Sequence, residues 1–369
     1  MDDALAYRIA FSSLRGMNRV MAEQLLARCG DEQRFFELDE RQLGAMMGFG
    51  NRLFDADYRR TMLDRGRREA DFIAAHNITP LYFTDDRYPA RLADADDAPL
   101  MLFSIGPADM NRGKIVAIVG TRHATPYGID FVNRLVGDLA ANMAEPLMIV
   151  SGLAFGIDAA AHQASLKAGV PTVGVLAHGL NTIYPAQHRQ LAADMVRGSG
   201  GLVTEYSSSD PVHKGNFVAR NRIVAGMSDC VVVAESAAKG GALITANLAA
   251  DYNRDVFALP GRTSDRYSAG CNDLIRRNVA ALVQDAGDIM HAMNWPAKES
   301  GQAVQQTLFQ ELSAEEQAVI DYLTECGEGQ LNQIAIAMNT NVGRMMSLLI
   351  DMEFKGLILT YPGGKYRLA

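Results

Sequence analysis

The stretch from Lys214 to Gly226, KGNFVARNRIVAG, carries side chains that could bind a nucleic acid strand. Ammonium and guanidinium groups bind phosphate, and a phenyl ring offers a face on which a base can stack. A helix with its apolar face at Val218, Ile223 and Val224 would follow a short loop. The candidate contacts are Lys214 and Phe217 in that loop, and Arg220, Asn221 and Arg222 on the helix.

Arg220 and Arg222 are two positions apart, so on a helix they point to different sides and at least one should face a cleft. The structural alternative is a solvated helix start with a core phenylalanine, in which this run pairs with Asp229 or Glu235. Cations, an amide and a ring crowd this one segment, so we favour the binding interpretation.

Six short apolar runs predict the fold around this stretch. Runs rich in Val and Ile, without polar alternation, are typical of strands buried on both faces, and helix-length connections indicate a parallel sheet. We therefore expect an α/β domain over residues 71–295 with a doubly wound, extended Rossmann-like parallel sheet. The runs are Ile115–Val119, Leu147–Val150, Thr172–Leu176, Leu202–Thr204, Val231–Ala234 and Val256–Leu259.

The turns after these strands hold most of the unusual residues. Right-handed crossovers place such turns along one edge of the sheet, where ligands of open α/β folds bind. Glycine lets backbone N–H groups approach an anion there, although a tight turn also needs glycine for steric reasons. The candidates are Gly120, Thr121 and Arg122 after the first run, Ser151 and Gly152 after the second, and Gly240 and Gly241 after the fifth.

Regions of different character flank the α/β domain. Residues 1–70 have apolar residues at helical spacing and two glycine turns, which resembles a SAM-like or helix-hairpin-helix domain. Residues 296–311 are polar and suit a linker. Residues 312–369 predict three helices and a hairpin, a winged-helix-like domain. Its seven acids and four bases favour a structural or protein-contact role over DNA reading.

Composition limits the classes of function. The formal net charge of −8 over 369 residues opposes a broad DNA-coating surface, so nucleic acid must sit in a local pocket. The four cysteines form no C-x-x-C pair, which argues against a zinc site and a disulfide framework. No apolar run is long enough to span a bilayer, and the N-terminus is acidic. We expect a cytoplasmic protein without membrane, metal or cofactor.

Motifs for catalysis are missing. The first turn, GTRHATPYG, departs from the dinucleotide fingerprint, and there is neither a P-loop nor a nucleophile elbow. Two acids lie at the expected edge, where Asp158 could cap the helix that it begins and Glu205 could pair with an arginine. Nothing in the sequence demands an enzyme.

The stretches VAIVGTR, SGLAFGIDAAAH, GLNTIYP, FVARNRIVAG, GGALITA and GCNDLI together resemble the DNA-processing protein A (DprA) family. The resemblance implies a non-enzymatic homodimer that binds single-stranded DNA in a basic pocket and helps load RecA recombinase during natural transformation and homologous recombination. By that match Arg122, Lys214, Phe217 and the run Arg220-Asn221-Arg222 contact DNA, with Gly240 and Gly241 beside them. Val218 and Ala219 stand where many relatives carry proline and a further base.

An enzyme is the alternative. Related Rossmann proteins of the nucleotide phosphoribohydrolase type carry a P-G-G-x-G-T-x-x-E turn whose glutamate serves the chemistry. The corresponding turn here, KGGALITANLA, lacks both the G-T pair and that glutamate. We therefore favour binding over nucleotide processing.

Overall fold

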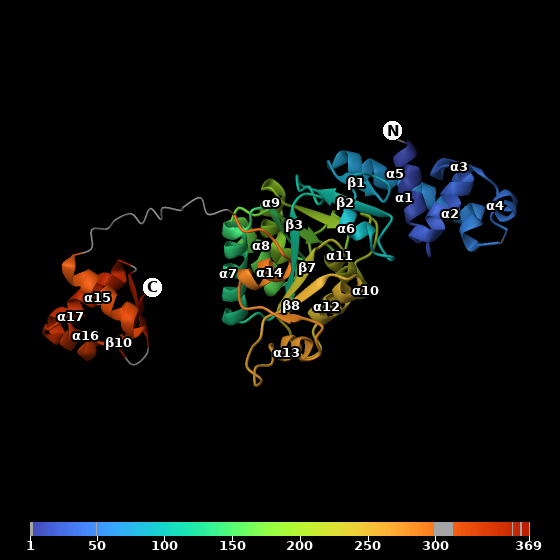
Figure 1. Ribbon diagram of the computed structural model, residues 1–369. Helices are drawn as coiled ribbons and strands as arrows, with labels where there is room; N and C mark the ends of the chain where they lie inside the picture. The colour runs from blue at the N-terminus through green and yellow to red at the C-terminus, as the bar shows by residue number, and fades with distance from the viewer. Residues whose placement is uncertain (1–2, 49, 299–312, 356, 362–363, 369) are drawn as a thin grey trace. The chain divides into compact units, whose positions relative to one another are not determined.

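The computed structural model describes residues 3–48, 50–298, 313–355, 357–361 and 364–368. The chain divides into two compact units, Met1–Glu299 and Ser300–Ala369. Each unit is described by itself below (Figure 1).

The first unit is built on a nine-stranded sheet with the order β1-β2-β6-β5-β4-β3-β7-β8-β9. The chain runs outward from β3 through β4 and β5 to β6, then crosses back to β7 on the other side of β3. The point where the winding reverses therefore lies between β3 and β7. The strands are β1 Thr79–Tyr82, β2 Met101–Ile105, β3 Lys114–Gly120, β4 Leu147–Ser151, β5 Thr172–Val175, β6 Gly201–Thr204, β7 Cys230–Glu235, β8 Asp255–Ala258 and β9 Ala281–Leu282.

The doubly wound α/β prediction is confirmed. The six predicted apolar runs fall on β3 to β8, which pair in parallel with their neighbours. The sheet is nevertheless mixed, because β2 pairs antiparallel with both β1 and β6. Only β2 therefore runs against the other strands, and it precedes the first crossover helix, so the six predicted runs carried no information about its direction.

Alternate residues of β3 enter two different cores. Ile115 and Ala117 pack beneath α11 (Asn221–Gly226) and α12 (Gly241–Asp251), whereas Val116 and Ile118 pack beneath α7 (Pro126–Asn142) and α8 (Ile157–Lys167). Successive side chains of a strand point to opposite faces, so a sheet with helices on both sides needs this unbroken apolar run. The remaining helices around the sheet are α6 Ala90–Ala93, α9 Arg189–Arg197, α10 Lys214–Ala219, α13 Ala269–Arg276 and α14 Ala286–Ala292, with short 3₁₀ turns η1 Arg52–Phe54 and η2 Ala186–His188.

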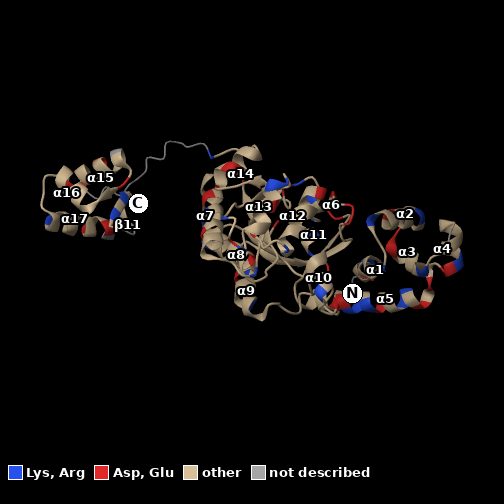
Figure 2. Ribbon diagram, turned by 90° about the horizontal axis from the view of Figure 1, so that it is seen from below, with Lys and Arg blue, Asp and Glu red and all other residues tan. Residues whose placement is uncertain are grey.

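Five helices precede the sheet: α1 Asp3–Ser12, α2 Arg19–Cys29, α3 Glu32–Glu37, α4 Glu40–Met47 and α5 Ala56–Ala75. Their core includes Phe11, Phe35 and Phe54, and it continues into Tyr82 and Phe103 of the first two strands. Acidic and basic residues interleave along α5 (Figure 2). Because α5 passes residue 70 and the core is shared, the division into 1–70 and 71–295 stays a prediction.

The second unit has its own core around Val319, Leu349 and Tyr366. Its elements are α15 Ala314–Cys326, β10 Gly329–Gln330, α16 Leu331–Ala337, α17 Val342–Phe354, β11 Ile358–Tyr361 and β12 Lys365–Leu368. The three helices and the antiparallel pairing of β11 with β12 have the order expected for residues 312–369. The winged-helix assignment stays a prediction. Most of the predicted linker, 296–311, lies outside the described residues, as do Pro362 and Gly363 of the predicted hairpin turn.

Candidate nucleic-acid interface

A pocket of about 330 Å³ lies where the winding of the sheet reverses, at the carboxyl ends of β3, β4 and β7. This is the place where open α/β sheets bind ligands. We call it the rim pocket. Nine of the twelve predicted site residues line it: Gly120, Thr121, Arg122, Gly152, Phe217, Arg220, Asn221, Gly240 and Gly241.

Arg220 forms the inner wall of the rim pocket and is 4% exposed. Its Nη1 donates to the carbonyl oxygen of Gly152 at 2.5 Å and to that of Val175, and its Nε lies 3.3 Å from Oδ1 of Asn221. Burial lowers the pKa of this guanidinium, and nearby Asp158 opposes that shift. The hydrogen bonds tie the start of α11 to the ends of β4 and β5.

Asp158 is the buried acid of the rim pocket. Its Oδ2 accepts hydrogen bonds from the backbone N–H groups of Gly152 at 3.2 Å and Ala154 at 3.3 Å. Burial raises the pKa of this carboxyl, while Arg220 and the two N–H groups act in the opposite direction. The prediction that Asp158 caps α8 is wrong, because the N-cap residue is Gly156 and Asp158 holds the preceding loop instead.

Arg222 points to the other side of α11 from Arg220, as helical spacing predicts, and lines a different pocket. Its Nη2 lies 2.5 Å from Oε2 of Glu205, and the two side chains are 18% and 16% exposed. The expectation that Glu205 pairs with an arginine is confirmed. The alternative partners are engaged elsewhere, since Asp229 pairs with Arg91 at 2.7 Å and Glu235 accepts hydrogen bonds from Thr125.

Lys214 and Phe217 lie on α10, which corrects the expectation of a loop. His213 caps this helix by accepting the N–H of Gly215 through Nδ1 at 3.0 Å. Positions three apart share one face of a helix, so the lysine lies beside the ring that lines the rim pocket. Lys214 is exposed and forms no ion pair with any residue that the structure describes.

Arg122 follows β3 directly and stands at the mouth of the rim pocket. It is exposed and, within the described parts of the chain, has no acidic partner. Its neighbour Gly156 has φ +76°, and a side chain there would collide with the backbone of Arg122 at 2.7 Å. A glycine is therefore required at position 156 for the β3 and β4 loops to touch.

Three predicted residues are placed less directly. The hydroxyl of Ser151 is fully buried and donates to the carbonyl oxygen of Ile118 at 2.6 Å, so its hydrogen bond serves the sheet. Gly240 caps α12, and a side chain there would collide with Oγ of Ser236. Gly241 has open space beside its Cα. Roles in binding stay predictions for all three.

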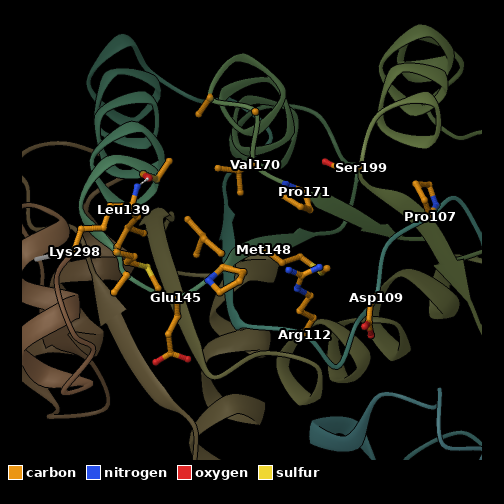
Figure 3. A pocket seen from close by; sticks show the side chains of 17 residues that line it. Pro107, Asp109, Arg112, Leu139, Glu145, Met148, Val170, Pro171, Ser199 and Lys298 are labelled. Carbon is orange, nitrogen blue, oxygen red and sulfur yellow. Dashed lines mark hydrogen bonds between the residues drawn. The ribbon is translucent and has the colours of Figure 1, made fainter.

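A larger cavity, of about 620 Å³, lies at the opposite edge of the sheet, among residues that precede the strands (Figure 3). Its floor is apolar, and its rim carries two cations, Arg112 and Lys298, and two acids, Asp109 and Glu145. The charges balance, and none of the predicted site residues lines it. This cavity offers no net attraction for phosphate.

Sequence reasoning missed two aromatic residues near the rim pocket. Tyr184 lies in the loop after β5, and its ring centroid is 5.4 Å from that of Phe217. Phe155, in the loop after β4, pairs with His188 at 5.0 Å. The signal that could have found them is an aromatic residue in the loop after each of two neighbouring strands, β4 and β5.

The described residues offer neither a metal site nor a membrane-crossing helix. No group of three or more His, Cys, Asp or Glu side chains could hold a metal ion there. No helix in the described ranges combines the length and apolar character that a bilayer crossing needs. The cysteines in those ranges are all free thiols, and Cys326 alone among them is exposed.

Comparison with known proteins points to one family. Residues 79–294 match the family model described as DNA recombination-mediator protein A. The chain is 30% identical to Protein Smf of Synechocystis over 98% of both chains, and 39% identical to DNA processing protein DprA of Streptococcus pneumoniae over 56% of this chain and 71% of that protein.

Solved structures agree. The crystal structure of DNA processing protein A from Streptococcus pneumoniae superposes with a TM-score of 0.65 at 32% identity, covering 79% of this chain and 98% of that one. DNA processing protein A from Helicobacter pylori, described for its single-stranded DNA binding mode, superposes with a TM-score of 0.52 at 28% identity, covering 59% of this chain and 95% of that one.

Proposed function

We propose that this chain, which belongs to the DNA recombination-mediator protein A family, binds single-stranded DNA at the rim pocket. One observation carries the proposal: Arg122 and Lys214, two cations without an acidic partner among the described residues, flank a pocket that also presents the ring of Phe217. Cations that hold phosphates and a ring that stacks on a base are the two parts of a sequence-tolerant site for single strands. A relative described as binding single-stranded DNA shares the fold.

The two buried arginines have a supporting part in this proposal. Arg220 and Arg222 already have hydrogen-bond partners in the protein, and moving either to a phosphate would leave carbonyl or carboxylate groups buried without a partner. We assign direct phosphate contacts to Arg122 and Lys214. Both arginines position α11, and Arg220 also contributes positive charge behind the pocket.

The pattern of charges favours a single strand over duplex. The net charge of −8 leaves no broad basic surface for two phosphate backbones, and the bases of a duplex are already stacked on one another. We expect binding that tolerates sequence changes and weakens with salt.

The cellular role rests on the family. We propose a homodimer formed through the α/β domain that helps load RecA recombinase onto single-stranded DNA, in natural transformation and homologous recombination, in the cytoplasm. Light scattering on residues 1–298, which keep the core that α1 to α5 share with β1 and β2, tests the dimer. A monomer at all micromolar concentrations would contradict it.

We favour a non-enzymatic role over a phosphoribohydrolase-like one. The stretch at the start of α12, KGGALITANLA, lacks the glutamate that serves the chemistry in phosphoribohydrolases, and the buried carboxylates near the rim pocket, Asp158 and Glu235, hold neighbouring loops through hydrogen bonds. Hydrolysis of a nucleoside monophosphate by the purified protein would reopen the enzyme alternative.

Charge reversal tests the binding site. Lys214→Glu and Arg122→Glu should each weaken binding of labelled oligo-dT by about tenfold or more, because each removes a phosphate contact and adds repulsion. Fluorescence polarisation measures the affinity, and a melting curve shows that each variant is folded.

The matched control is Lys167→Glu, which makes the same charge change at the exposed last residue of α8, on the opposite edge of the sheet. It should bind oligo-dT as the parent does. If all three variants bind alike, the rim pocket is not the site.

A further inference from the structure

Three segments that follow neighbouring strands bring aromatic rings close to the rim pocket. Phe155 follows β4, Tyr184 follows β5 and Phe217 follows β6, and these strands are neighbours in the sheet. Phe155 is 41% exposed and Tyr184 is 52% exposed. Large aromatic side chains are usually kept from water, so two exposed rings beside one pocket point to a ligand with flat apolar faces.

Contacts between the turns hold these rings in place. Tyr184 and Phe217 meet edge to face at 5.4 Å, and the backbone N–H of Tyr184 donates to Nε2 of buried His178 at 3.2 Å. On the other side, Phe155 meets His188 at 5.0 Å, and Nδ1 of His188 lies 2.9 Å from the carbonyl oxygen of Leu153. The rings are therefore fixed before a ligand arrives, which lowers the entropic cost of binding.

Cations accompany the rings along the same edge. Arg189 begins α9 directly after His188, and Lys239 lies in the turn after β7. Both are exposed, and neither forms an ion pair with a described residue. Together with Arg122 and Lys214 they place a positive charge after four of the strands that end at this edge.

We propose that Tyr184 and Phe155 continue the single-strand path beyond the rim pocket, each stacking on one base, with Arg189 on the phosphates between them. This inference rests on the proposed function, and it names residues and bases outside the rim pocket. The ring centroids of Phe217 and Tyr184 lie 5.4 Å apart, so a strand that reaches the first ring also reaches the second.

Contacts between the rings and the pocket set the course of this path. It starts at Phe217, which lines the rim pocket, and passes to Tyr184, whose ring meets that of Phe217; Phe155 directly follows Ala154 of the pocket lining. The path stays on one edge of the sheet. Base stacking depends on π faces, which every base has, so the path reads no sequence.

Abasic DNA separates stacking from every other effect of a substitution. Tyr184→Ala and Phe155→Ala should each weaken binding of oligo-dT of about 12 nucleotides by about tenfold, the loss of one stacked base. The same variants should bind an abasic strand of equal length as the parent does, because that strand has phosphates but nothing to stack. Tyr184→Phe, which keeps the ring, should restore the affinity for oligo-dT.

Phe72→Ala is the matched control, since Phe72 is also a partly exposed ring that pairs with a histidine, His76, but on α5. It should leave both affinities unchanged.

If Tyr184→Ala and Phe155→Ala bind oligo-dT normally while Lys214→Glu does not, the path is wrong and the rim pocket stands. If they weaken oligo-dT and abasic DNA equally, the rings only support the fold and the inference fails. Normal binding of oligo-dT by Lys214→Glu would contradict the proposed function itself.

Discussion

The guanidinium of Arg220 fills the space that a side chain at Gly152 would need. A Cβ built on Gly152 would lie 2.5 Å from Cζ of Arg220, and the carbonyl oxygen of the same glycine accepts a hydrogen bond from that arginine. A long cation can be buried here because the turn after β4 has no side chain and turns its carbonyl inward. Gly152 is therefore needed for the packing of Arg220, whether or not a ligand also approaches its backbone.

Gly152→Ala should therefore destabilise the protein. The added methyl group must displace the guanidinium or the turn, and overpacking of this kind costs about 1 to 3 kcal/mol. Urea unfolding followed by circular dichroism measures the loss. Gly137→Ala, at a helical position of α7 with open space around it, is the control and should be neutral or slightly stabilising. Equal stability of the two variants would contradict the packing argument.

Arg222→Met should destabilise the protein in a way that depends on pH. Burial raises the pKa of Glu205 above its ordinary 4.5, and Arg222 opposes that rise, so removing the arginine raises the pKa further. When an acid has a higher pKa in the folded state than in the unfolded state, the free energy of unfolding falls as pH rises from the unfolded pKa to the folded pKa. The free energy of unfolding of Arg222→Met should therefore differ least from that of the parent near pH 4.5. At pH 8 the difference should reach about 3 kcal/mol, the cost of a buried charge without its partner.

The control for this pair is Glu205→Gln in the Arg222→Met background. Without a carboxyl group at position 205, the pH dependence of the deficit should disappear. Urea unfolding at pH 5 and pH 8 provides the comparison. A deficit of Arg222→Met that is the same at both values would show that the ion pair is not its cause.

His162 should make the fold sensitive to acid. It is fully buried, its Nδ1 lies 2.7 Å from Oγ1 of Thr172, and burial lowers its pKa from 6.5 to about 3. Between these two pH values the unfolded chain carries a proton on His162 and the folded chain does not. The free energy of unfolding therefore falls as pH drops from 6.5 towards 3. The slope should reach about 1.4 kcal/mol per pH unit.

His162→Asn keeps a polar group beside Thr172 and removes the titration. Its free energy of unfolding should change less than that of the parent between pH 6.5 and pH 5, by about 1.6 kcal/mol. Parallel pH profiles for the two proteins would mean that His162 takes up its proton in the folded state.

Much of this fold follows from local pattern, because a strand buried on both faces has to be apolar throughout. The runs at Ile115–Val119 and Val231–Ala234 therefore predict β3 and β7 to within a residue or two. The turns follow from the same pattern, since a ligand-binding edge lies where those runs end. Their glycines and cations could be named as candidates before any coordinates were known.

Side-chain partners across the chain could not be predicted in the same way. Helical spacing separates Arg220 from Arg222, but it does not say which of them is buried. That depends on carbonyl groups at Gly152 and Val175, which are 68 and 45 residues away. The rings of Tyr184 and Phe155 were missed for a related reason, because each looks like an ordinary loop residue until the sheet places the loops side by side.

Salt dependence should separate the cations of the rim pocket from its ring. Each phosphate contact that is lost should reduce the slope of log affinity against log salt by about 0.7 for a single strand, so Lys214→Gln and Arg122→Gln should each flatten it by that amount. Phe217→Ala should weaken binding with an unchanged slope, because stacking releases no counterions. Polarisation titrations at several salt concentrations measure both quantities. A flattened slope for Phe217→Ala would contradict its assignment to stacking.

Removal of residues 312–369 should leave the affinity for single-stranded DNA nearly unchanged. This segment carries seven acids and four bases, and it belongs to a compact unit separate from the one that holds the rim pocket. Its cations are engaged as well, since Arg344 pairs with Glu315 at 2.5 Å, Lys355 with Glu316 at 2.6 Å and Lys365 with Glu328 at 2.5 Å. An acidic segment with paired cations neutralises few phosphates, so its loss should not flatten the salt slope. Titration of oligo-dT with the full chain and with the shortened one measures the difference. A loss of more than about tenfold, some 1.4 kcal/mol, would show that this unit binds DNA in spite of its charge.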